Sequence, residues 1–389
     1  MENKRALVFI VISIAFSVMM FSCGSGGGID KLDFSGDWPP IPSLPPGPPS
    51  PQPPQPPLPP TSNAWIIETV ENGGYLGNIA TDSSGKVHII YGHGNADIKY
   101  ATNSSGSWVT QIVDSDGSLG GDRSIATDSS GKVHISYSGY TNRTLKYATN
   151  ASGSWVTETV DGERRVGYYN SIAIDSSGKV HISYSDFWNA DLKHATNSSG
   201  PWVTETVDSE GFVGNYNAIA VDSSGKVHIS YSGNGNAGIK YATNSSASWV
   251  TETIDDGGGA GGISSIAVDS SGKVHISYRS YNPDNLKHAS NSSGSWVKET
   301  VDSDGHVADV TSIATDSSNN VHISYYNWYH SALLYATNAS GSWVKETVDG
   351  DGSIGRSDSA IDIDLSNNIH ISYFNDIGAL KYAFKQSGS

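Results

Sequence analysis

The sequence of 389 residues is poor in several residue types on which other kinds of protein depend. It holds a single cysteine, so no disulfide can form within the chain. Only 23 lysines and arginines stand against 39 aspartates and glutamates, and the formal net charge is -16. Proteins that bind nucleic acid neutralise phosphates with clustered basic side chains, so this charge balance argues against a nucleic-acid partner.

Long uncharged hydrophobic runs are also scarce, and the one present lies near the N-terminus. Lys4 and Arg5 precede an apolar run over residues 6–21, which is the arrangement of a secretory signal peptide. The run is shorter than the roughly 20 apolar residues that a membrane-spanning helix needs, so we expect it to be removed.

The segment MFSC, which ends at Cys23, resembles the lipobox of bacterial lipoproteins, although Met20 and Phe21 differ from the usual residues. In that family the signal peptide is cut before a cysteine that is then lipidated. The resemblance implies a signal peptide over residues 1–22, lipid attachment at Cys23 and a place on the bacterial cell envelope. The alternative is an ordinary secretory signal followed by an unrelated cysteine.

Proline is rare outside one stretch, because residues 39–60 hold 14 of the 16 prolines. Together with the preceding GSGGG, this composition builds no packed core and favours polyproline II. We therefore expect residues 23–63 to form a tether; a ligand for SH3-like domains is the alternative.

The remaining residues, 64–389, consist of one unit repeated seven times. The decapeptide DSSGKVHISY starts at 128, 175, 222 and 269. After one shorter first interval, tryptophans recur every 47 residues, at Trp65, Trp108, Trp155, Trp202, Trp249, Trp296 and Trp343. Histidines recur at nearly the same step, at His88, His134, His181, His228, His275, His322 and His370. Four short β-rich segments in each repeat of this length are typical of a propeller blade, so the sequence predicts an all-β, seven-bladed β-propeller.

The connections between segments predict the order of strands in a blade. In the third unit the four segments are WVTETV (155–160), SIAID (171–175), KVHISY (179–184) and LKHAT (192–196). The longest uniform connection joins WVTETV to SIAID, so SIAID is expected to be innermost and WVTETV outermost. The repeats begin with an outer segment at 65–70 and end with a third segment at 379–384, and we expect these two to pair and close the ring.

The segment TNASGSW at 149–155 falls between the predicted third and outer strands and contains a turn glycine and an aromatic residue. In these features the repeats over residues 64–385 resemble the Asp-box or BNR-type propellers of bacterial surface proteins, a superfamily that includes sialidases and lectins. Asn150 stands in place of the aspartate, and Gly153 precedes Trp155 by two residues, not three. The resemblance implies the propeller fold; Asp boxes are structural turns remote from the active face.

Residues that recur in every unit are expected to serve the architecture. Equivalent positions on stacked sheets lie about 10 Å apart, whereas a metal ion binds nitrogen at about 2 Å. The seven histidines are therefore expected to be packed, hydrogen-bonded residues between blades, and the tryptophans to cap the outer edge. Asn-x-Ser matches such as Asn103 are interpreted as turns, as are DSDG and DGDG at 114–117, 302–305 and 349–352, in preference to calcium loops. No metal and no cofactor are predicted.

The units differ in two loops per blade, and these loops are expected to open on one face of the ring. This diverse loop face holds every arginine of the propeller and both of its non-repeated tryptophans. Guanidinium groups and aromatic rings around a concave mouth are typical of recognition surfaces. A first candidate ligand-binding group, from the second and third blades, is Arg123, Tyr140, Arg143, Arg164, Arg165, Tyr168, Tyr169, Phe187 and Trp188. A second, from the fifth and sixth blades, is Arg279, Tyr281 and Trp328, with Tyr326 and Tyr329.

These groups leave three functions open. Aromatic faces that stack on sugar rings favour glycan binding, but aromatic and arginine side chains are also hot spots for protein partners, so a scaffold of the envelope is the alternative. A sialidase-like hydrolase needs a carboxylate pair, for which Glu163 and Asp186 are the nearest candidates. The arginines are spread over four blades and no FRIP-like motif is present. We therefore expect a monomeric, envelope-anchored propeller that binds a glycan and lean against an enzyme.

The lipid anchor is tested by the Cys23→Ala variant of the full chain. Because the thiol is the attachment point for the lipid, this variant is expected to leave the detergent phase in which the parent partitions. Phase partitioning of cell extracts measures the effect, with Ser25→Ala as the control that stays in the detergent phase. Equal partitioning of the Cys23→Ala variant and the parent would contradict lipidation.

Overall fold

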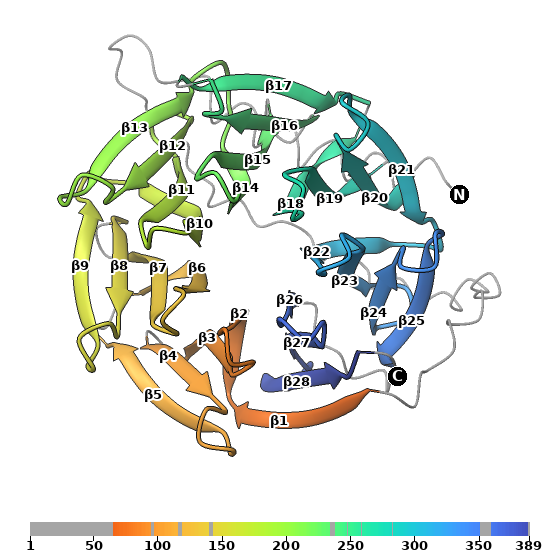
Figure 1. Cartoon of the computed structure of the whole chain (residues 1–389), viewed down its shortest axis with the longest axis horizontal. Coiled ribbons are helices and arrows are strands. Elements are labelled where there is room, and N and C mark those ends of the chain that lie inside the picture. The colour runs from red at the N-terminus through yellow and green to blue at the C-terminus, as the bar shows by residue number, and fades with distance from the viewer. Residues whose placement is uncertain are drawn as a thin grey trace, which may run out of the picture. The chain divides into compact units, whose positions relative to one another are not determined.

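Seven four-stranded antiparallel sheets stand like blades around a common axis (Figure 1), as the repeats predict. The computed structural model describes residues 65–94, 97–115, 119–139, 143–233, 238–246, 248–257, 259–281, 283–350 and 359–387. The predicted signal peptide and tether, with Cys23, lie outside these residues. No helix in the described part of the chain is long and apolar enough to cross a membrane.

The order of strands from the axis outward agrees with the prediction in every blade. The innermost strands are β2 (Gly74–Thr81), β6 (Leu119–Thr127), β10 (Val166–Ile174), β14 (Asn215–Val221), β18 (Ala260–Val268), β22 (Val307–Thr315) and β26 (Ala360–Ile363). The second strands are β3 (Val87–His93), β7 (Val133–Gly139), β11 (Val180–Asp186), β15 (Val227–Gly233), β19 (Val274–Tyr281), β23 (Val321–Asn327) and β27 (Ile369–Phe374). The third strands are β4 (Asp97–Thr102), β8 (Leu145–Thr149), β12 (Asp191–Thr196), β16 (Gly238–Thr243), β20 (Asp284–Ser290), β24 (Ala332–Thr337) and β28 (Ala379–Lys385). The outer strands are β5 (Val109–Asp114), β9 (Val156–Asp161), β13 (Val203–Asp208), β17 (Val250–Asp255), β21 (Val297–Asp302), β25 (Val344–Asp349) and β1 (Ile66–Asn72).

Ring closure by the first strand is confirmed. β1 pairs with β28 from Ile66 opposite Phe384 to Asn72 opposite Ala379. Blade 7 is therefore made from both ends of the propeller, whereas blades 1 to 6 are β2–β5, β6–β9 and so on in chain order (Figure 1). This pairing covers the edge of β28 that would otherwise present unpaired backbone groups.

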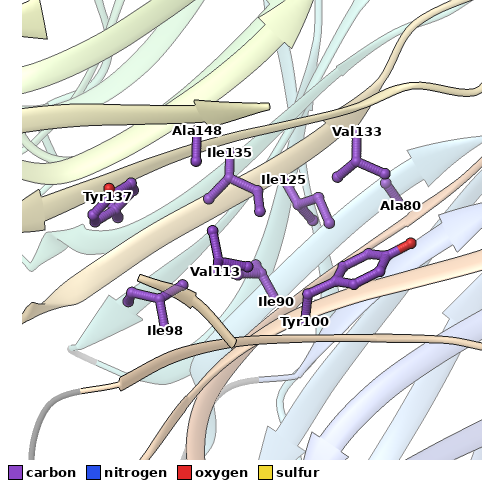
Figure 2. Close-up of a cluster of buried hydrophobic side chains, with 10 residues drawn as sticks. All are labelled: Ala80, Ile90, Ile98, Tyr100, Val113, Ile125, Val133, Ile135, Tyr137 and Ala148. Carbon is purple, nitrogen blue, oxygen red and sulfur yellow. The ribbon is translucent and has the colours of Figure 1, made fainter. Parts of the chain in front are cut away.

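The hydrophobic core lies between blades rather than on one side of a sheet. Along β3, Ile90 packs toward blade 2, while Ile89 and Tyr91 pack toward blade 7. Figure 2 shows the core shared by blades 1 and 2, made by Ala80, Ile90, Ile98, Tyr100, Val113, Ile125, Val133, Ile135, Tyr137 and Ala148. Each fully buried side chain of this size contributes about 1.5–3 kcal/mol relative to exposure, so every blade depends on both neighbours.

The DSSG sequence recurs because it builds the turn between the first two strands of a blade. The Asp82 Oδ1 atom accepts hydrogen bonds from the backbone N–H groups of Ser84 and Lys86, at 2.8 and 2.9 Å. Gly85 takes a positive φ of 74°, which glycine adopts without steric cost. Burial alone would raise the pKa of Asp82, but these hydrogen bonds hold it below its ordinary value.

The repeated histidines are buried, as expected, but their hydrogen bonds lie within one blade and not between blades. His134 shares a hydrogen bond of 2.6 Å between Nδ1 and the Tyr147 hydroxyl of the neighbouring strand. Its Nε2 atom lies 3.3 Å from the carboxylate of Asp128 in the turn of the same blade. The imidazole thus ties the second strand to the third strand and to the turn.

The repeated tryptophans do more than cap the outer edge, because each joins its blade to the preceding one. The Trp155 ring meets the Tyr100 ring edge-on at 5.2 Å, and its Nε1 atom donates to Gln111 at 3.0 Å. The same edge contact recurs around the ring in the pairs Trp65–Tyr335, Trp108–Tyr382, Trp202–Tyr147, Trp249–His194, Trp296–Tyr241 and Trp343–His288. Such pairs contribute about 0.5–1.5 kcal/mol beyond the area they bury.

A second joint links each blade to the preceding one near the opposite face. The hydroxyl of Tyr184 donates to the Asp161 carboxylate at 2.7 Å, and Lys193 approaches the same oxygen at 3.1 Å. Tyrosines at the equivalent position donate to Glu71, Asp114, Asp208, Asp255, Asp302 and Asp349. Because each buried tyrosine has a charged partner, the joint holds the blades in register without an unsatisfied polar group.

Removal of β1 tests the closure. A chain that begins at Asn72 lacks the outer strand of blade 7 and exposes the edge of β28, so we expect a lower melting temperature or edge-to-edge oligomers. A chain that begins at Ala64 keeps β1 and is the matched control. Thermal unfolding and size-exclusion chromatography measure both effects; an equally stable monomer beginning at Asn72 would show that β1 does not close the ring.

The histidines predict a loss of stability in mild acid. Burial lowers the pKa of all seven, to about 4 for His181, so the folded protein keeps them neutral below their ordinary value of 6.5. Their contribution is complete above pH 6.5 and falls as the unfolded chain takes up protons that the folded chain refuses. Raised pKa values of Asp122, Asp191 and Asp362 oppose this loss in part. The urea midpoint should therefore fall between about pH 7 and about pH 5; an unchanged midpoint would contradict neutral buried histidines.

Candidate functional site

The antiparallel strands place the variable loops of every blade on one face of the ring, the diverse loop face. The loops after the second and outer strands, such as 187–190 and 209–214 of blades 3 and 4, open on the face opposite the DSSG and NSSG turns. Predicted site residues Arg143, Arg164, Arg165, Phe187 and Trp188 lie in such loops, whereas Tyr140 lies outside the described residues, as does Arg356 of this face.

Aromatic side chains from blades 3 and 4 form a row on this face. The ring of Tyr168 lies 5.4 Å from that of Phe187, and Phe187 meets Phe212 edge-on at 6.3 Å. Phe187 is 44% exposed and Phe212 is 42% exposed. The guanidinium of Arg143, from blade 2, lies 5.2 Å from the centre of the Tyr168 ring, so the row begins at a cation.

Trp188 follows Phe187 and, at 72%, is the most exposed aromatic side chain among the residues that the structure describes. The guanidinium of Arg165 lies 5.1 Å from its ring. Asp186 fixes the loop, because its carboxylate accepts hydrogen bonds from the Trp188 and Asn189 N–H groups and from the Asn189 side-chain amide. The Arg165 carbonyl accepts a hydrogen bond of 3.0 Å from the Phe187 N–H. The loop therefore presents Trp188 on a supported backbone.

The candidate carboxylate pair does not form an open acid–base pair. Asp186 is 2% exposed and is occupied by the hydrogen bonds that hold its own loop. Glu163 is exposed and lies 3.6 Å from the Lys193 ammonium group. The geometry gives Asp186 a structural role, which disfavours hydrolysis by these two residues.

Two residues of the first predicted group lie apart from the row. Arg123 is only 8% exposed and donates to the carbonyls of Tyr75 and Leu76, with its guanidinium 5.2 Å from the Tyr75 ring, so it ties blade 2 to blade 1. Tyr169 packs at 4.6 Å against Tyr216 of blade 4, on the inner strands. The structure thus brings Arg143, Arg165, Tyr168, Phe187 and Trp188 together and leaves Arg164 exposed beside them.

The second predicted group centres on an ion-pair network that the sequence did not indicate. The guanidinium of Arg279 lies 4.4 Å from the Tyr281 ring and donates to Asp284 at 3.0 and 3.2 Å. The Nδ1 atom of His306 contacts the other carboxylate oxygen of Asp284. The His306 carbonyl accepts a hydrogen bond of 2.9 Å from the Trp328 N–H, which brings the loops of blades 5 and 6 together.

Sequence reasoning missed Phe212, Tyr216 and His306 on this side of the ring. Phe212 and His306 were detectable, because each is a ring-bearing side chain in a loop whose counterparts in other blades, such as Gly259 and Ser353, carry no ring at that point. Tyr216 precedes the repeated strand sequence by two residues and gave no signal of facing the axis.

The opposite face has a cleft at the closure of the ring. It measures about 620 Å³ and lies between blades 7 and 1, beside the ends of β1 and β28. No turn joins these two strands, whereas an NSSG-type turn covers the equivalent place in the other blades. Within the described ranges no three His, Cys, Asp or Glu side chains gather as a metal site would require.

Comparison with known proteins finds the fold and no closer kinship. No family model and no curated protein matches the chain. Hydrazine synthase of Kuenenia stuttgartiensis superposes with a TM-score of 0.59 at 8% identity, over 83% of this chain and 98% of that one. AofleA of Arthrobotrys oligospora superposes with a TM-score of 0.51 at 12% identity, over 74% of this chain and 92% of that one. The six-bladed fucose-recognising lectin of Aleuria aurantia superposes with a TM-score of 0.48 at 12% identity, over 73% of this chain and 98% of that one. At these identities the likeness establishes the β-propeller fold alone, and the resemblance to Asp-box repeats stays a prediction.

Proposed function

We propose that this chain is a ligand-binding propeller that recognises a glycan through the loops of blades 2 to 4, anchored to the bacterial envelope by a lipid on Cys23. The observation that carries the proposal is the exposed aromatic row with Trp188 beside it. Exposed rings of this size leave apolar area in water that a bound partner would cover. The lipid attachment rests on the sequence MFSC alone.

The chemistry of the row suits a saccharide. Sugar rings present C–H faces that pack on aromatic rings, and their hydroxyls pair with charged and amide groups at the edge of the aromatic platform. Arg143, Arg165 and Asn189 border Tyr168 and Trp188 in this way. The loop is held by Asp186 before any ligand arrives, which reduces the entropy lost on binding.

A protein partner is the second candidate, since the stack of Arg165 on Trp188 combines two residue types enriched in interface hot spots. The same face would then dock an envelope or extracellular protein. The two functions differ in what binds, while they use the same residues.

A glycan array with the propeller beginning at Ala64 tests the proposal. Trp188→Ala should weaken binding of the selected glycan by about 1–3 kcal/mol, or roughly fivefold to 150-fold, as the loss of an aromatic anchor does. Because Trp188 is exposed, its replacement should leave the melting temperature nearly unchanged. Leu365→Ala, at an exposed apolar residue of the opposite face, is the matched control and should bind as the parent does.

Unchanged binding by Trp188→Ala would place the site elsewhere, and the group around Trp328 in blades 5 and 6 would be tested next. If no glycan binds, while a purified envelope protein binds the parent and not Trp188→Ala, the scaffold function replaces glycan recognition.

A further inference from the structure

A separate pocket lies on the propeller axis, where the inner strands β2, β6, β10, β14 and β18 surround the centre (Figure 1). It measures about 230 Å³. Five of its residues occupy the same place in the repeat, six positions before the aspartate of the DSSG turn, and define the axial pocket: Leu76, Asp122, Tyr169, Tyr216 and Ile263. The side chains at this position differ in size and charge from blade to blade. The architecture therefore does not require one residue type there, and the position can serve ligand binding.

The backbone at this place is distorted in a way that turns side chains toward the axis. Leu76, Tyr169 and Tyr216 have positive φ angles of 48°, 51° and 48°. Each sits where the pairing with the second strand shifts register, which is the mark of a β-bulge. A left-handed conformation strains the backbone of a non-glycine residue, and such strain gathers at binding sites.

Most polar groups of the pocket wall already have partners within the protein. Asn170 accepts a hydrogen bond from Ser136 and donates to the carbonyls of Asp122 and Gly167. Asn217 makes the corresponding bonds to Ser183 and Gly214.

Two further wall residues are engaged in the same manner. Ser264 pairs with Ser230 and donates to the Tyr216 carbonyl. Arg123 directs its guanidinium to the carbonyls of Tyr75 and Leu76. A ligand rich in hydroxyl groups would find few free partners here.

The Asp122 carboxylate is the charged group that remains for a ligand. Burial raises its pKa above the ordinary value, while a hydrogen bond from the Tyr169 N–H and the charge of Arg123 lower it in part. Beside it the hydroxyls of Tyr169 and Tyr216 are hydrogen-bonded to each other, so their rings stand together at 4.6 Å.

We propose that the axial pocket binds a small organic cation, with an alkylammonium group held between the Asp122 carboxylate and the rings of Tyr169 and Tyr216. A carboxylate shielded from water gains more from a cation than a solvated one does. Aromatic ring faces attract ammonium groups, and the alkyl part suits the side chains of Leu76 and Ile263. The net charge of -16 favours the approach of cations. None of these residues belongs to the aromatic row, so the inference is independent of glycan binding.

Calorimetry with choline and with dimethylbutanol, its uncharged carbon analogue, tests the proposal on the propeller beginning at Ala64. Choline should bind the parent at least about tenfold more tightly than dimethylbutanol, because only choline carries the charge. Asp122→Asn should lose about tenfold or more in choline affinity, and so should Tyr216→Leu, which removes the ring face and keeps a side chain of apolar character. Asp191→Asn is the control, since burial also raises the pKa of Asp191 but it lies outside the pocket.

Three results would overturn the inference: no binding of choline to the parent, equal binding of dimethylbutanol, or full affinity in Asp122→Asn and Tyr216→Leu. Circular dichroism of each variant shows whether it folds, and the comparison of the two ligands on the parent needs no variant. Trp188→Ala should bind choline as the parent does, which separates failure of this site from failure of the aromatic row.

Discussion

The contact between neighbouring blades is the constraint on which the molecule depends. A single four-stranded sheet would leave both faces wet, so each blade is stable only when both faces are buried. Two polar joints fix the relative position of the sheets: the tryptophan that meets an aromatic ring of the preceding blade, and the buried tyrosine that donates to its carboxylate. Because every blade must satisfy both neighbours, the same residues return seven times, and the last joint is completed by β1.

This demand separates structure from recognition. The second strand carries His134, Ser136 and Tyr137 into contacts that any blade would need, and none of them is free to meet a ligand. What remains variable are the loops of one face and one position on the inner strand. The aromatic row lies in the variable loops, and the axial pocket is lined by the variable position of the inner strands. Both are supported by groups already fixed within the fold, such as Asp186 beneath Trp188 and Asn170 beside Tyr169.

The features of the fold that the repeat determines could be predicted from the sequence. Strand order, blade number and the pairing of 65–70 with 379–384 follow from where the unit starts and stops, and all are confirmed. For the site, the sequence predicted only the face of the ring on which it lies, because the repeat does not determine the geometry of the variable loops. Arg123 was grouped with Arg143, yet its guanidinium caps carbonyls between blades 1 and 2. Tyr168 and Tyr169 are adjacent in sequence, and the bulge in β10 sends one to the row and the other to the axis.

The central claim is that the variable loops bind the ligand while the repeated residues only stabilise the fold. Hydrogen exchange of backbone amides, measured with and without the glycan selected on the array, tests it most directly. We predict slower exchange in the presence of glycan at residues 162–168, 186–190 and 209–214, with exchange in the DSSG and NSSG turns unchanged. Protection confined to those turns, or to the cleft between blades 7 and 1, would contradict it.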